Sequence, residues 1–183
     1  DAGLISDLRK YNDVNFPSSF KRIFSQSTDI NSLHLKVIHN LVEKINPSSI
    51  LDVGCGECFL LNSLYEKGYR SLSGVDFFIN TNSKRKINLI SSEISKYLNS
   101  LKNKSFDLVI STHTIEHLPN YELVLSEIRR ISKDSIIIVC PLEKKFKWGY
   151  NNHVNFFENK SEFLKSITDQ NIINNNKIFI KEF

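Results

Sequence analysis

One stretch of ten residues, Ser49–Cys58, constrains the fold of this chain more than any other. Its apolar start is typical of a buried strand, Gly54 and Gly56 follow, and an apolar, helix-like segment begins at Phe59. Glycine permits a sharp turn and lets a ligand lie against the backbone. A helix that starts at such a turn offers N–H groups to an anion. The stretch therefore predicts a strand, a turn and a helix that hold a nucleotide-like cofactor.

The spacing of the glycines separates two kinds of cofactor. A dinucleotide-binding turn has the pattern G-x-G-x-x-G, but here Phe59 occupies the position of the third glycine. Asp52, two residues before Gly54, is not part of that pattern either. The turn therefore does not fit the fingerprint of NAD-binding proteins.

The stretch Ile50–Gly56 (ILDVGCG) closely resembles motif I of the class I methyltransferases, which bind S-adenosylmethionine (SAM). Ser73–Asp76 resembles strand two of that family, Phe106–Pro119 resembles motif IV with the segment after it, and Ile136–Pro141 resembles strand five. The resemblance covers about residues 48–168. It implies SAM as the cofactor and methyl transfer as the reaction.

The resemblance also implies which residues contact SAM. Asp76 lies 20 residues after Gly56 and would bind both ribose hydroxyls, although NAD-binding proteins place an acid at the same distance. Phe77 would flank the adenine ring. Glu93 would accept a hydrogen bond from the adenine amino group or, alternatively, only pair with a helix dipole. The predicted cofactor residues are Asp52, Gly54, Cys55, Gly56, Asp76, Phe77, Glu93, Thr112 and His113.

Strands and helices alternate along the chain. The patterns predict helices at Asp29–Ile45, Glu57–Lys67, Asn120–Ser132 and Lys160–Ile167, strands at Leu72–Asp76, Ile87–Ile90, Phe106–Ser111 and Ser135–Cys140, and a strand or short hairpin at Ile172–Phe183. Such alternation predicts an α/β fold with a doubly wound, mostly parallel, Rossmann-like sheet. We interpret residues 1–183 as one methyltransferase domain, in which residues 1–47 form a helical cap and residues 48–183 the SAM-binding core.

Four residues of the N-terminal segment are candidates either for completing the substrate pocket or for pinning the segment to the core: Tyr11, Phe16, Phe20 and Arg22. We expect His34 and His39, which lie off the apolar stripe of the first predicted helix, to be exposed.

Two histidines follow strands four and five and are candidates for catalysis. Methyl transfer is an in-line displacement that can need a base for the acceptor's proton, and histidine titrates near neutral pH. We predict His153 or His117 as this base, with the other orienting or binding the substrate; alternatively, His117 is structural, at a helix start. His153 lies in an irregular stretch, residues 141–158, and stretches of that length are usually functional.

The acceptor is predicted from resemblance as well. Tyr150–Phe157 resembles the segment that closes over the acceptor in sugar and quinone-type O-methyltransferases. This implies a hydroxyl or amine of a small metabolite, with a sugar or nucleotide-linked sugar favoured. Trp148 and Tyr150 would stack on a sugar face or, alternatively, pack in the core.

Other interpretations stay open. His113, Glu116, His117 and His153 could surround one cation, which resembles the Glu/Glu/His/His set of small-RNA 3′-end 2′-O-methyltransferases, with His113 in place of a Glu. Our leading prediction includes no metal. An RNA methyltransferase would need the basic clusters at residues 84–86 and 144–147 on one face. A SAM-binding subunit without catalytic activity is a third interpretation.

Composition restricts the partners. The net charge is +4 with scattered lysines, which argues against a nucleic-acid partner. There is no apolar run of membrane-spanning length and no signal-peptide pattern, so we expect no membrane partner. The three cysteines form no even-numbered disulfide framework, and we interpret Cys55 and Cys58 as small packing residues in a cytoplasmic protein. The sequence leaves the oligomeric state open.

Overall fold

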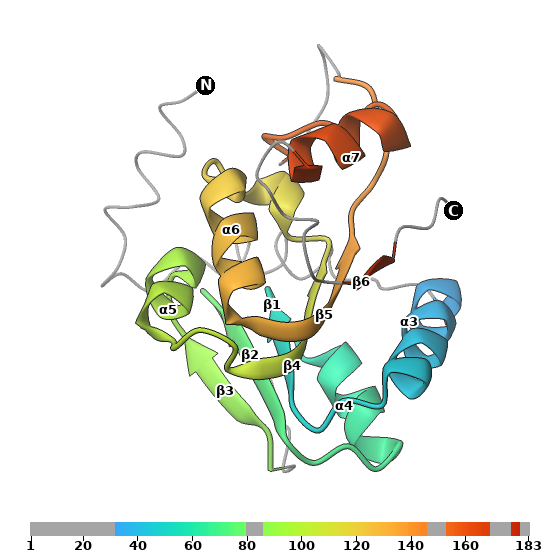
Figure 1. Ribbon diagram of the computed structural model, residues 1–183, viewed down its shortest axis with the longest axis vertical. Coiled ribbons are helices and arrows are strands. Elements are labelled where there is room, and N and C mark those ends of the chain that lie inside the picture. Colours follow the sequence, from blue (N-terminus) through green and yellow to red (C-terminus); the bar gives the residue numbers. More distant parts are fainter. Residues whose placement is uncertain (1–31, 80–85, 146–152, 169–176, 180–183) are drawn as a thin grey trace, which may run out of the picture.

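A computed structural model describes residues 32–79, 86–145, 153–168 and 177–179 (Figure 1). These residues form a six-stranded sheet with the order β3-β2-β1-β4-β5-β6, and every strand pair is parallel. The predicted doubly wound α/β fold is confirmed. The strands are β1 (Ile50–Val53), β2 (Leu72–Asp76), β3 (Asn88–Ser91), β4 (Phe106–Thr112), β5 (Ser132–Val139) and β6 (Lys177–Phe179).

The order of the strands creates a crevice at the centre of the sheet. From β1 the chain moves outward through β2 to β3, and then returns to place β4 on the other side of β1. The connections therefore diverge beyond the carboxyl ends of β1 and β4. In open α/β sheets, ligands bind at such a switch point.

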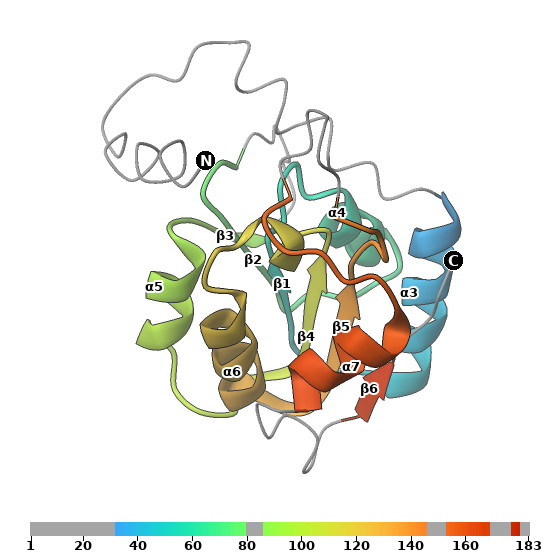
Figure 2. The same cartoon turned by 90° about the horizontal axis from the view of Figure 1, so that it is seen from above.

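Helices cover both faces of the sheet (Figure 2). One layer contains α3 (Ser32–Ile45) and α4 (Phe59–Glu66), and the opposite layer contains α5 (Ile94–Ser100) and α6 (Tyr121–Ile131). Each strand buries alternate side chains against the two layers: Val109 of β4 packs with α5 and α6, whereas Leu108 and Ile110 pack with α3 and α4. Burial on both faces explains the nearly continuous apolar runs of the sequence. The remaining helical elements are the 3₁₀ turn η2 (Ile115–His117) and α7 (Lys160–Thr168).

Some element boundaries differ from the prediction. Helix α4 starts at Phe59 and not at Glu57, because Cys58 before it has a left-handed backbone with φ of 63°. Strand β5 starts at Ser132, directly after α6, and not at Ser135. Of the predicted C-terminal strand or hairpin, the structure describes β6, which pairs in parallel with β5. The predictions for six residues concern positions outside the described residues: Tyr11, Phe16, Phe20, Arg22, Trp148 and Tyr150.

The expectation that His34 and His39 are exposed was wrong. Both side chains are half-buried, because α3 packs beside α4 and reaches the end of β4. Nε2 of His39 lies 2.9 Å from Oγ of Ser63 on α4. Nδ1 of His34 lies 3.4 Å from Nε2 of His113, and the two rings stack with centroids 5.4 Å apart. Helix α3 thus brings a histidine to the crevice.

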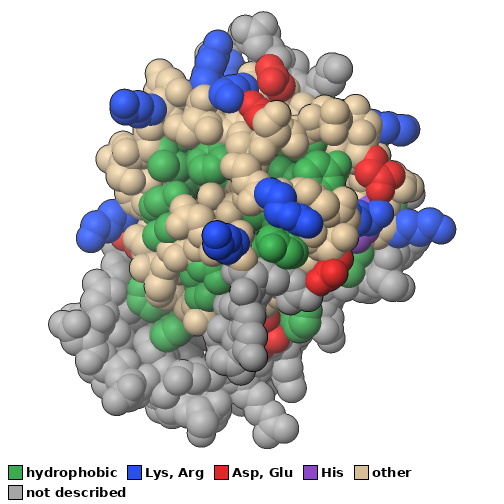
Figure 3. Space-filling view, turned by 90° about the horizontal axis from the view of Figure 1, so that it is seen from below, with side chains coloured by type: hydrophobic (Ala, Val, Ile, Leu, Met, Phe, Trp, Pro, Cys, Tyr) green, Lys and Arg blue, Asp and Glu red, His purple; other side chains and the backbone are tan. Residues whose placement is uncertain are grey.

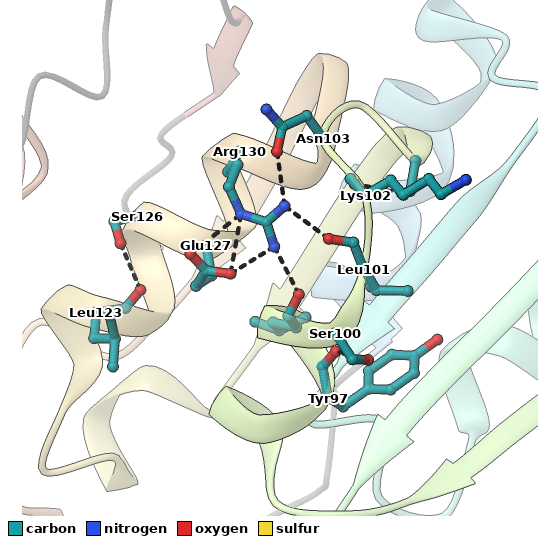
Figure 4. A network of polar contacts seen from close by, with 11 residues as sticks. Tyr97, Ser100, Leu101, Lys102, Asn103, Leu123, Ser126, Glu127 and Arg130 are labelled. Atoms are coloured by element: carbon teal, nitrogen blue, oxygen red, sulfur yellow. Dashed lines mark hydrogen bonds and ion pairs between the residues drawn. The ribbon is translucent and has the colours of Figure 1, made fainter.

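A polar network centred on Arg130 joins α6 to α5 and to the loop that follows α5 (Figure 4). Its guanidinium group donates to the backbone oxygens of Leu98 and Leu101 at 2.8 and 2.7 Å, and to Oδ1 of Asn103 at 2.8 Å. It also forms an ion pair with Glu127 at 2.6 Å. We refer to these five residues as the Arg130 network.

One face of the molecule can be compared with the surface that an RNA partner would need. On the face that Figure 3 shows, Lys and Arg side chains are scattered over the surface and do not form one continuous stripe. The basic clusters that the RNA interpretation needs fall partly in residues 80–85 and 146–152, outside the described residues. Among the described helices, none has the length and apolar character that a membrane crossing requires.

Candidate active site

The glycine turn between β1 and α4 forms one wall of the crevice. Gly54 and Gly56 have positive φ values of 80° and 49°, in the region that favours glycine. A Cβ atom at Gly54 would lie 2.0 Å from Oγ1 of Thr114, so the backbone there has no room for a side chain. The amides of Gly54 and Cys55 both donate to the carbonyl of Val75 on β2, at 2.8 and 3.1 Å. These two bonds fix the turn to the sheet.

An open pocket lies at the switch point, at the carboxyl ends of β1 and β4. Five of its lining residues come from the predicted cofactor set, and two, Phe59 and Leu60, were missed. These two begin α4, and their place directly after the glycine turn was the signal that could have found them. The lining residues are Asp52, Gly54, Cys55, Phe59, Leu60, Thr112 and His113.

Two carboxylates mark the cofactor side of the crevice. Asp52 is buried, and within the described part of the chain its Oδ1 accepts no hydrogen bond. Burial, and then the negative charge of Asp76, raise the pKa of Asp52 to about 7. An ammonium group at Oδ1 would satisfy this oxygen, and the methionine part of SAM carries one. The residues present therefore fit this cofactor.

Asp76 ends β2 and accepts hydrogen bonds from the backbone amides of Gly56, at 2.8 Å, and Phe78, at 3.0 Å. Burial raises the pKa of Asp76, and these hydrogen bonds partly oppose the shift. Its carboxylate is thereby held at the glycine turn. The lone pairs that remain on its oxygens suit the ribose hydroxyls for which it was predicted.

Phe77 and Glu93, the predicted adenine contacts, do not line the pocket. The Phe77 side chain is exposed and meets the ring of Phe78 edge to face, with centroids 5.0 Å apart. Glu93 is exposed at the start of α5 and accepts a hydrogen bond from Ser95. Their contacts with adenine stay predictions.

The segment that follows β5 brings His153 close to His117 of η2. The backbone amides of Val154 and Asn155 donate to the carbonyl of Glu116, at 2.8 and 3.0 Å. The side-chain amide of Asn155 donates to the carbonyls of Ile115 and Leu118, at 2.8 and 2.7 Å. These four bonds fasten the segment after β5 to η2. As a result, the rings of His117 and His153 lie 4.8 Å apart, inclined at 70°.

Two carboxylates complete this second group of side chains. Glu143 contacts Nδ1 of His153. Glu116 is 1% exposed, and its Oε1 lies 3.4 Å from Nδ1 of His113. Sequence reasoning missed Asn155 and Glu143, because their partners lie about 10 to 40 residues away along the chain. We call Glu116, His117 and His153 the acceptor-side cluster.

A parallel sheet wound in this order, with a glycine turn at the switch point and an acid at the end of β2, defines a class I methyltransferase domain. The family described as "Methyltransferase domain" matches residues 51–140, and this part of the chain belongs to it. The family and its cofactor, SAM, which the sequence predicted, are thereby confirmed.

Several solved structures are similar over part of the chain. A SAM-dependent methyltransferase from Archaeoglobus fulgidus is 27% identical, over 56% of this chain and 51% of that one, with a TM-score of 0.45. The PH0226 protein from Pyrococcus horikoshii is 25% identical, over 65% and 62%, with a TM-score of 0.44. WbdD, crystallised with a kinase inhibitor, is 23% identical, over 67% and 32%, with a TM-score of 0.50, and supports the fold alone. No curated protein matches the chain.

Proposed function

We propose that this chain is a SAM-dependent methyltransferase that modifies a hydroxyl or amine of a small metabolite. The observation that carries the proposal is the position of His113. This residue lines the cofactor pocket, and its Nδ1 lies 3.4 Å from the Glu116 carboxylate. The cofactor pocket and the acceptor-side cluster are therefore neighbours, as a direct transfer requires.

Each side of the crevice has a distinct task in this proposal. Asp52 binds the ammonium group of the cofactor and Asp76 its ribose, which orients the activated methyl group that SAM supplies. His117 and His153 bind the acceptor. As the acceptor's oxygen or nitrogen forms its bond to the methyl carbon, the carbon–sulfur bond breaks with its electron pair on sulfur, and the acceptor loses a proton. Without a cation in the cluster, one of the two imidazoles takes that proton.

The acceptor class we favour is a sugar or a nucleotide-linked sugar. The polar groups of His117, His153 and Glu143 on one side of the crevice support an acceptor that carries several hydroxyl groups.

We also propose a cytoplasmic location. The odd number of cysteines supports this location, because secreted domains that depend on disulfides usually carry an even number.

The first test is a calorimetric and thermal-shift titration of the chain with SAM and with S-adenosylhomocysteine. We expect both to bind and to raise the melting temperature. Asp76→Asn should abolish or greatly weaken binding, whereas the matched control Asp107→Asn, an acid at the other end of β4 from the pocket, should bind as the parent does. Binding of NAD but not of SAM would contradict the proposed function.

Acceptor specificity is tested next by methyl transfer from labelled SAM to a panel of sugar nucleotides and free sugars. His153→Gln and His117→Gln should each lower the rate at least about 100-fold, in the range that general acid–base groups contribute. Their affinity for SAM should be unchanged. Transfer to RNA at a comparable rate, with binding that weakens as salt rises, would favour the RNA alternative.

A further inference from the structure

The acceptor-side cluster contains a buried acid, Glu116, that has few polar contacts among the described residues. Glu116 is 1% exposed, and within the described part of the chain neither carboxylate oxygen takes part in a hydrogen bond. Nδ1 of His113 lies 3.4 Å from Oε1 of Glu116. Burying an ionised carboxylate without close partners is unfavourable. A bound positive charge would remove this cost.

The surrounding atoms fit a metal cation. One ligand atom from each of Glu116, His117 and His153 can be chosen so that all three lie within 4.8 Å of one another. Ligands of a tetrahedral zinc ion are about 3.4 Å apart, as follows from metal–ligand bonds of about 2.1 Å. Small side-chain rotations would therefore bring the three ligand atoms to the separations that one bound ion requires.

We propose that Glu116, His117 and His153 bind one divalent transition-metal cation and leave a coordination position open for the acceptor. Two imidazole nitrogens and one carboxylate form a ligand set found in catalytic zinc sites. Imidazole ligands also favour such metals over Mg²⁺ and Ca²⁺, which prefer oxygen. This inference departs from the leading sequence prediction, which included no metal, and its statement about the acceptor rests on the proposed function.

The backbone holds the three ligands in place before any metal binds. Glu116 and His117 belong to η2, and the amides of Val154 and Asn155 fix the segment that carries His153 to the Glu116 carbonyl. Glu143 contacts Nδ1 of His153, and we therefore assign Nε2 of that ring to the cation. Metal-binding histidines usually donate their other N–H to a carboxylate in this manner.

A cation changes the role of the two imidazoles from bases to ligands. A hydroxyl bound at the open position would have a lower pKa, because the cation stabilises its deprotonated form. Its proton would leave to solvent water. The resulting oxygen would then form the bond to the methyl carbon, while the electron pair of the broken bond stays on sulfur.

The test is a calorimetric titration of the chelator-treated chain with Zn²⁺. We expect one ion per chain, with binding weakened at least about tenfold in Glu116→Gln, since even the loss of an outer partner of a ligand has an effect of that size. The matched control is His39→Gln, a half-buried histidine that faces Ser63 and not the cluster, which should bind zinc as the parent does.

Replacing Zn²⁺ with Co²⁺ identifies the metal ligands, because the visible absorption spectrum of Co²⁺ depends on them. Histidine and carboxylate ligands give visible absorption without the thiolate charge-transfer band that a site at Cys55 and Cys58 would produce. A thiolate band would overturn the proposal. So would equal zinc affinities of the parent and Glu116→Gln, or no zinc binding by a chain that binds SAM.

Titration of the same samples with SAM separates the two proposals. A chain that binds zinc through Glu116 but does not bind SAM would support the metal site and contradict the methyltransferase function. A chain that binds SAM and methylates its acceptor at full rate in excess chelator would support the proposed function and overturn the metal site.

Discussion

Two polar regions of this molecule differ in how completely their charges are paired. In the Arg130 network, the guanidinium group has Glu127 as its ion partner and three further oxygens as acceptors, all within 2.8 Å. At the carboxyl edge of the sheet, Asp52 and Glu116 are each 1% exposed, yet both have a carboxylate oxygen without a hydrogen bond from the described residues.

This difference separates a structural role from a binding role. A network with every group paired stabilises the fold and gains nothing from a ligand. A buried acid that lacks donors costs free energy in the unliganded chain, and this cost is returned when a cation binds. The two regions should therefore respond in opposite directions when their charges are removed.

The largest change in stability is expected from Arg130→Ala. Removing the guanidinium group leaves Glu127, the Leu101 carbonyl and Oδ1 of Asn103 without this donor, while the Leu98 carbonyl keeps the amide of Leu101. We therefore expect the free energy of unfolding to fall by about 3 kcal/mol. Urea unfolding measures this, with Lys102→Ala, in the neighbouring loop, as the control. SAM affinity should not change. A loss below about 1 kcal/mol would show that the network is not a structural element.

The pH dependence of stability tests Asp52. Burial, and then the charge of Asp76, raise the pKa of Asp52 to about 7 in the folded chain, whereas in the unfolded chain it is about 3.9. Between these values the folded state holds a proton that the unfolded state has lost, so stability falls as pH rises. From pH 5 to pH 7 we expect this group to lower the free energy of unfolding by up to about 2.5 kcal/mol.

Asp52→Asn should remove this slope, because the amide does not titrate. It should also weaken SAM binding, since the amide does not attract the cofactor's ammonium group. Urea unfolding at several pH values compares the two chains. Identical slopes in the parent and in Asp52→Asn would show that Asp52 keeps an ordinary pKa.

Asn155→Ala tests how the segment after β5 holds the acceptor-side cluster. Loss of the two side-chain hydrogen bonds to η2 should lower the free energy of unfolding by about 1–2 kcal/mol. The displacement of His153 should lower kcat at least about tenfold. The control is Asn159→Ala on the same segment. Asn159 accepts from the amide of Glu162 at the start of α7, so its loss should cost about 1 kcal/mol without changing kcat.

The smallest change in stability is expected from Glu116→Gln, and it should have the opposite sign. In the presence of a chelator, this variant should be as stable as the parent or more stable by up to about 1 kcal/mol, because a buried charge is removed. Its rate of methyl transfer should nevertheless be strongly reduced. A clear loss of stability would place Glu116 among the paired, structural charges.

The residues predicted to bind SAM are easier to recognise in the sequence than those predicted to bind the acceptor, for a physical reason. The glycine turn, Asp52 and Asp76 are recognised from local patterns, because a strand, a turn and a helix follow one another in the chain. The pocket accordingly includes Asp52 and His113, as predicted. Their binding to SAM is a prediction that the titrations above test.

The acceptor half depends on contacts between distant segments. His117 and His153 were recognised as single residues, but their pairing requires the bonds of Asn155 to η2, which no local pattern indicates. The role of His34 was missed, because its contact with His113 spans 79 positions of the chain. Helix boundaries shifted for a local reason, such as the left-handed backbone at Cys58.

The way in which the segment after β5 is fastened has a consequence for how such enzymes diversify. The amide of Glu143 donates to the carbonyl of Phe157, and a few residues away Val154 and Asn155 are bound to Glu116. The stretch between Glu143 and His153 therefore starts and ends at fixed points. Its length and composition can change at small entropic cost. If the proposed function holds, exchanging this stretch as a unit would change the acceptor while the bonds of Glu143, Val154 and Asn155 stay in place.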